Sequence, residues 1–166
     1  MQPGIVRWIA VLFAACNPGP DSGESADAAP ADDATPGCTP SGVTETDATR
    51  TTDAASVTVT ATLRNALEHC TKAEFAFGLV FDTHSVDLLA IDITASTTIE
   101  TSNGGQLGGA LTWSPGSESS HHRDGVLTAP APALDGADWL RLTIDEVAGV
   151  DRVFEWDASL LAHDLP

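Results

Sequence analysis

Residues 74–81 have the sequence EFAFGLVF, and residues 56–63 have the sequence SVTVTATL. In both stretches every second residue is apolar. An apolar period of two is typical of a β-strand that buries one face, whereas an amphipathic helix repeats every 3.6 residues. These two stretches therefore predict a β-sheet packed on one side against a core.

Similar short segments continue to residue 157. Six more are apolar and rich in β-branched or aromatic residues: residues 89–93, 97–101, 107–113, 125–128, 139–144 and 152–157. Only residues 63–71 suit a turn of helix. We therefore expect an all-β fold over residues 56–157, an immunoglobulin-like antiparallel β-sandwich of seven or eight short strands, with residues 158–166 as a C-terminal tail. Burial of its tryptophans and phenylalanines would form most of the core.

The first fifteen residues have the features of an export signal. Residues 8–15, WIAVLFAA, form an apolar run too short to span a bilayer, and they follow a basic residue, Arg7. Residues 12–16, LFAAC, resemble the bacterial lipobox, although Phe13 stands where leucine is usual. The resemblance implies a lipoprotein-type signal peptide over residues 1–15, lipidation of Cys16 and a protein anchored by lipid in the bacterial cell envelope, on the periplasmic face or the cell surface. Ordinary cleavage after Ala15 is the alternative.

Residues 16–55 are predicted to be a disordered acidic linker behind the lipidated cysteine. Residues 17–53 contain five prolines and eight acidic residues against one arginine, and they lack leucine, isoleucine, phenylalanine and tryptophan. Such a segment cannot offset the entropy cost of folding. Cys38 and Cys70 remain as a candidate disulfide, because an oxidising compartment favours one. Metal ligation by His69 and Cys70 is the alternative, but no second pair of ligands accompanies them at the spacing expected of a metal site.

The charge balance excludes some classes of function. The chain has 7 Lys and Arg against 24 Asp and Glu, a net charge of −17, so it repels phosphate and no nucleic-acid partner is expected.

Ser85, His84 and Asp87 lie too close in sequence to form a hydrolytic triad easily, and no nucleophile-elbow motif is present. Ser119 or Ser120 with His84 would be freer, but no motif supports that pair. We expect no enzymatic activity.

Two polar segments are not needed by the strand pattern. Residues 82–87, DTHSVD, follow an apolar strand, and residues 121–124, HHRD, precede another. Together with residues 113–127 and the RVFEW of residues 152–156, they resemble an uncharacterised family of small prokaryotic extracytoplasmic domains with THSVDL, HHRxGVL and RxFxW motifs. The resemblance implies a common fold and a shared site, without an assigned activity. Ser119 and Ser120 stand where that family usually has glycines.

Imidazole and carboxylate side chains are common ligands of transition metals. The sequence therefore predicts a Zn or Cu site assembled from six residues: His84, His121, His122, Asp82, Asp87 and Asp124. The alternative is a structural polar network, in which Asp82 and Asp87 fix turns, Arg123 pairs with one of them and the histidines bond to the backbone.

Two functions follow from these features. One is a membrane-anchored, non-catalytic envelope lipoprotein that binds a divalent metal or a small ligand. The other is a purely structural or protein-interaction module, with an envelope protein as its partner.

Overall fold

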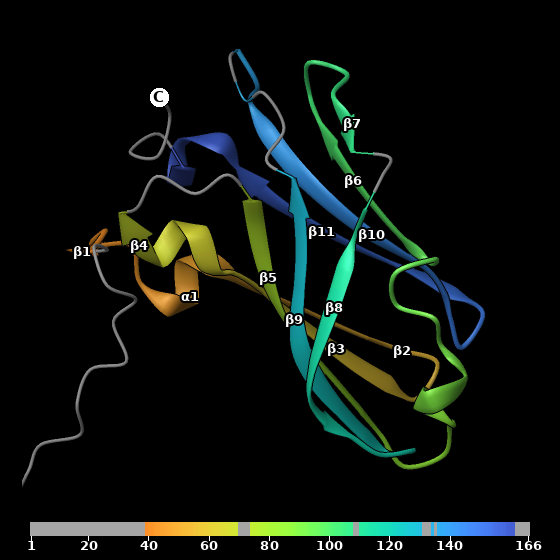
Figure 1. The fold of residues 1–166 in the computed structure, drawn as a ribbon. Helices are drawn as coiled ribbons and strands as arrows, with labels where there is room; N and C mark the ends of the chain where they lie inside the picture. The colour runs from red at the N-terminus through yellow and green to blue at the C-terminus, as the bar shows by residue number, and fades with distance from the viewer. Residues whose placement is uncertain (1–38, 70–73, 108–109, 131–133, 135, 162–166) are drawn as a thin grey trace, which may run out of the picture. The chain divides into compact units, whose positions relative to one another are not determined.

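The structure, a computed structural model, describes residues 39–69, 74–107, 110–130, 134 and 136–161. This part of the chain forms two antiparallel sheets that lie in layers over a common core (Figure 1). The expected all-β sandwich is confirmed. Within the described residues, no helix is long and apolar enough to cross a bilayer.

One layer is a five-stranded sheet with the order β2-β3-β5-β9-β8. Its strands are β2 (Thr49–Ala54), β3 (Val57–Leu63), β5 (Glu74–Thr83), β9 (His122–Pro130) and β8 (Thr112–Glu118). Burial alternates along β3 and β5, as the sequence predicted, because successive side chains of a strand point to opposite faces.

The second layer is a four-stranded sheet with the order β11-β10-β6-β7. Its strands are β11 (Val150–Asp157), β10 (Trp139–Val147), β6 (Thr97–Thr101) and β7 (Gln106–Leu107). A two-residue pair, β1 (Thr39–Pro40) with β4 (Glu68–His69), lies apart from both sheets. The helical pieces are short: α1 (Glu45–Ala48), η1 (Arg64–Leu67), η2 (Leu88–Ala90) and η3 (Ala158–Leu161).

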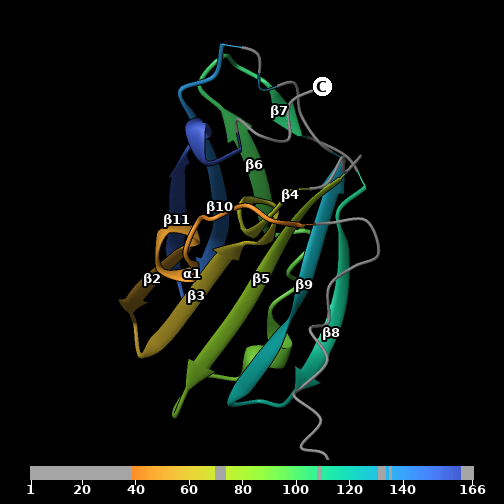
Figure 2. The same cartoon turned by 90° about the vertical axis from the view of Figure 1, so that its left-hand side faces the viewer.

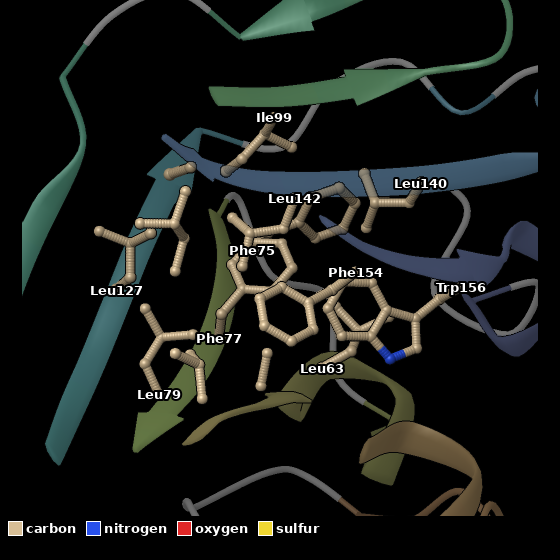
Figure 3. Packing of buried hydrophobic residues seen from close by; sticks show 14 of the residues in the cluster. Leu63, Phe75, Phe77, Leu79, Ile99, Leu127, Leu140, Leu142, Phe154 and Trp156 are labelled. Carbon is tan, nitrogen blue, oxygen red and sulfur yellow. The ribbon is translucent and has the colours of Figure 1, made fainter. Parts of the chain in front are cut away.

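The core lies between the two sheets (Figure 3). Trp156 of β11 is fully buried there, with its ring centroid 5.7 Å from that of Phe77, and its indole Nε1 donates to the main-chain oxygen of Ala48 at 2.7 Å. Trp113 and Trp139 are only half-buried, so Trp156 is the fully buried one of the three described tryptophans. Trp139 instead stacks with Arg141, whose guanidinium lies 4.2 Å from the ring centroid.

The folded part begins earlier than the sequence predicted. Residues 49–54, assigned to the linker, form the edge strand β2, which lies beside β11 (Figure 2). Arg50 Nε donates to the main-chain oxygen of Glu155 at 3.0 Å, and buried Arg152 donates to that of Ala54 at 2.5 Å. The strand was missed because main-chain pairing and arginines hold it in place, while its own side chains are mostly threonine.

Another segment expected to be a strand, residues 89–93, is not one. Its main chain forms η2 and then a loop, and Leu89 is 53% exposed. The alternation of apolar residues was misleading here because Asp87 caps η2, accepting a hydrogen bond from the Leu89 amide at 3.1 Å. The loop between β5 and β6 is therefore irregular.

The five-stranded sheet has two distinct ends. The chain enters β2 from α1, where Thr49 pairs with Thr62 near the end of β3. At the other end, Thr58 pairs with Asp82, which pairs in turn with His122. The residues of the predicted signal peptide and the predicted roles of Cys16, Cys38 and Cys70 lie outside the described residues.

Candidate functional site

Two of the predicted site residues meet on the outer face of the five-stranded sheet. Asp82 of β5 and His122 of β9 are direct cross-strand partners, and His122 Nδ1 donates to Asp82 Oδ1 at 2.6 Å. Both side chains are about half exposed, at 57% and 47%. The sheet register thus places together two residues that lie far apart in sequence.

Asp124 completes this cluster. It lies two residues after His122 on β9 and therefore on the same face, with its Oδ1 4.0 Å from His122 Nε2. The same oxygen accepts a hydrogen bond from the Ser117 amide at 2.6 Å, at the irregularity between Pro115 and Ser117 of β8. Asp124 therefore links the histidine to the bulged edge strand.

The two carboxylates favour the charged form of the imidazole. The hydrogen bond that His122 donates to Asp82 raises the pKa of His122 above its ordinary value of 6.5, and the charges of Asp82 and Asp124 act in the same direction. Partial desolvation opposes them. His122 therefore holds its proton more firmly than a free histidine does.

The other predicted ligands do not join the cluster. His84 and His121 are exposed, and within the described chain neither ring makes a hydrogen bond or an ion pair. The Asp87 carboxylate caps η2 instead. Across the described ranges, no group of three or more His, Cys, Asp and Glu side chains is arranged to hold a metal ion.

Arg123, between His122 and Asp124, points the opposite way, into the sandwich. Its guanidinium donates to the Glu118 carboxylate at 2.9 Å and to the main-chain oxygens of Leu88 at 3.0 Å and Ile91 at 2.7 Å. The expectation that it pairs with Asp82 or Asp87 is wrong, because alternation along β9 puts it on the other face from Asp82.

Trp113 contributes to the same inner network. Its indole Nε1 donates to Glu118 at 3.2 Å, and its ring centroid lies 5.8 Å from the Arg123 guanidinium. The hydrogen bonds from Trp113 and Arg123 lower the pKa of the Glu118 carboxyl. Through Arg123, the HHRD segment thus attaches the β5–β6 loop to the sheet.

A shallow groove of about 500 Å³ crosses the outer face of the five-stranded sheet. We call it the outer groove. Six of the residues that line it are Thr62, Arg64, Gly78, Val80, Ser114 and Asp124. It could not be predicted from the sequence, because most of these residue types carry no recognisable chemistry. The one available signal was Gly78 within a strand, a position that often allows close approach of a ligand.

The Asp82–His122 pair resembles the base and orienting acid of a catalytic triad. In the described residues, however, no serine, threonine or cysteine side chain is hydrogen-bonded to His122 Nε2. The arrangement can hold a proton or donate a lone pair from Nε2.

Comparison of the sequence with protein-family models finds no match, and comparisons with curated proteins and with solved structures find none either. The resemblance based on the THSVDL, HHRxGVL and RxFxW motifs stays a prediction.

Proposed function

We propose that this protein is a non-catalytic binding module of the bacterial cell envelope. It would be exported, anchored in the membrane by a lipid on Cys16, and carried on an acidic spacer. Its ligand would bind in the outer groove. The export and anchoring parts of this proposal rest on residues 1–16, and the binding part rests on the surface of the five-stranded sheet.

The observation that carries the binding part is the groove itself. It lies on a rigid sheet, between α1 and η1 at one end and the Asp124 region at the other. Its outward residues Gly78, Val80 and Val126 are half-buried rather than exposed, although they lie on the outer face. A concave surface with a few polar groups is the usual form of a binding site.

A leucine at position 78 tests this proposal. A Cβ added at Gly78 would meet only ordinary contacts, 3.8 Å from Thr62 and Arg64, and the rest of the leucine in Gly78→Leu would occupy the groove that Gly78 lines. Thr143→Leu, on the outer face of β10, is the matched control. We expect the full chain and the control to bind a common ligand on peptide or glycan arrays, and Gly78→Leu to lose it. Unchanged binding by Gly78→Leu would contradict the proposal.

The Asp82–His122 pair favours a second function, weak binding of a divalent transition metal. A metal-binding histidine commonly donates its other ring N–H to a carboxylate, as His122 donates to Asp82. His122 Nε2 and Asp124 would then be the protein ligands, with solvent in the remaining positions. This pair replaces the six-residue set that the sequence predicted.

Calorimetric titration of the full chain with Zn²⁺ tests the metal site. His122→Ala and Asp124→Asn should each abolish the binding heat, whereas His84→Ala should leave it unchanged. Equal and negligible heat in the unmodified protein and the variants would reject the metal-binding function and leave the binding module without a metal.

A further inference from the structure

Arg64 is the one described arginine without an internal partner. Arg50, Arg123, Arg141 and Arg152 all donate to carboxylates or main-chain oxygens. Arg64 is exposed, and it has neither a hydrogen bond nor an ion pair within the described residues. Glu45, which lines the same end of the outer groove, does not pair with it either.

The side chain of Arg64 lies along the groove. Its Cδ and Cγ would be 3.8 and 3.9 Å from a Cβ built on Gly78, so its aliphatic stem lies over that glycine. A stem in this position brings the unpaired guanidinium to the groove that Arg64 lines. Guanidinium groups bind carboxylates with good geometry.

An opposite charge lies further along the same groove. Asp124 is the cross-strand partner of Val80, two residues after Gly78 on β5, a separation of about 7 Å along the strand. Its Oδ1 is occupied by the Ser117 amide, which leaves the second carboxylate oxygen, Oδ2, for a ligand. The groove is therefore positive at Arg64 and negative at Asp124.

We propose that the outer groove binds an extended peptide segment of a partner protein, with an acidic side chain at Arg64 and a basic side chain at Asp124. Side chains two residues apart in an extended peptide point to the same face and are spaced by about 7 Å. This spacing matches the step along β5 from Gly78, beside which the Arg64 stem lies, to Val80, the cross-strand partner of Asp124. The inference rests on the proposed function, since it names the ligand of the same groove.

Two features favour a peptide lying on the face over other ligands. Among the described residues that line the groove, none is aromatic, so a sugar ring has no surface on which to stack. Addition of a strand at the β8 edge is impeded by Pro115 and by the irregularity that follows it.

Fluorescence anisotropy with synthetic peptides tests the inference on the full chain purified in detergent. The probe is a labelled peptide of serine and threonine that carries one glutamate and one lysine separated by a single residue. We expect replacement of the probe's glutamate by glutamine to weaken binding about three- to five-fold. Arg64→Gln should weaken binding of the original probe by the same factor, and this variant should bind the two probes equally. The control Arg141→Gln should bind the original probe as tightly as the unmodified protein does and should still prefer it to the glutamine probe.

Several results would overturn the inference. These are equal binding of the two probes, equal binding by Arg64→Gln and Arg141→Gln, or no binding of either probe. Glycan binding that Gly78→Leu abolishes would keep the groove as the binding surface and reject the peptide. Probe binding that survives Gly78→Leu would reject the groove as well.

Discussion

Arg123 binds Glu118 through two guanidinium nitrogens, with Nε at 3.0 Å and Nη2 at 2.9 Å from the same carboxylate oxygen. The third nitrogen, Nη1, donates to the main-chain oxygens of Leu88 and Ile91. A single side chain therefore joins β8, β9 and the β5–β6 loop, so this arginine acts as a structural cross-link.

We expect Arg123→Met to destabilise the domain by about 2 to 3 kcal/mol, because it leaves the Leu88 and Ile91 carbonyls and the Glu118 carboxylate without their donor. Urea unfolding measures the change in the free energy of unfolding. The control is Arg141→Met, which removes a surface pair with Glu155 and should cost about 1 kcal/mol or less. Similar losses in the two variants would show that Arg123 is no cross-link.

The Asp82–His122 pair predicts a pH dependence of stability. Because the pKa of His122 is raised in the folded state, the stabilisation is complete below the ordinary value of 6.5 and is lost as the pH rises through the higher folded value. His122→Gln should remove this component, so its melting temperature should fall less than that of the unmodified protein between pH 5.5 and pH 8.5. The difference should be small, since both side chains are about half exposed. Parallel pH profiles of the two proteins would contradict the assignment.

Gly125 occupies a position where a side chain has no room. A Cβ there would lie 2.5 Å from the Ser114 main-chain oxygen and 2.8 Å from the Trp113 ring. Gly125→Ala should therefore destabilise the domain by about 1 to 3 kcal/mol through overpacking. Gly78→Ala, where contacts begin at 3.8 Å, is the matched control and should change stability little. Thermal melts of both variants check this prediction, and equal midpoints would refute it.

The proposed anchor predicts that Cys16→Ser moves the protein from the membrane fraction to the soluble fraction. A lipid on Cys16 would hold the chain to a bilayer, and serine has no sulfur atom with which to form the thioether to the lipid. Metabolic labelling with a radioactive fatty acid, followed by fractionation, measures both effects. Label in the Cys16→Ser protein, or its continued presence in membranes, would place the anchor elsewhere.

The fold could be predicted from the sequence to the extent that it depends on local alternation. Strands β3, β5, β6, β10 and β11 were located because each buries one regular face. Strand β2 was missed because its side chains give no apolar signal. Residues 89–93 gave that signal, yet they form η2 and a loop held by Arg123.

The candidate site was predicted only in part for a similar reason. The sequence marked Asp82, His122 and Asp124 as unusual polar residues, but whether His84, His121 or His122 meets a carboxylate depends on strand register. The outer groove depends on residues from four strands, α1 and η1, such as Gly78 and Arg64, that are unremarkable one at a time. No local pattern in the sequence contains that information.

The described chain begins beside α1, where Ser41 donates its amide to the Leu67 oxygen of η1. His122 and Asp82 lie at the opposite pole of the sheet from Thr49. A bead or a bilayer that holds this domain by its amino terminus is therefore attached at the end of the sheet beside α1. The end of the described sheet that carries His122 and Asp82 then lies away from the point of attachment.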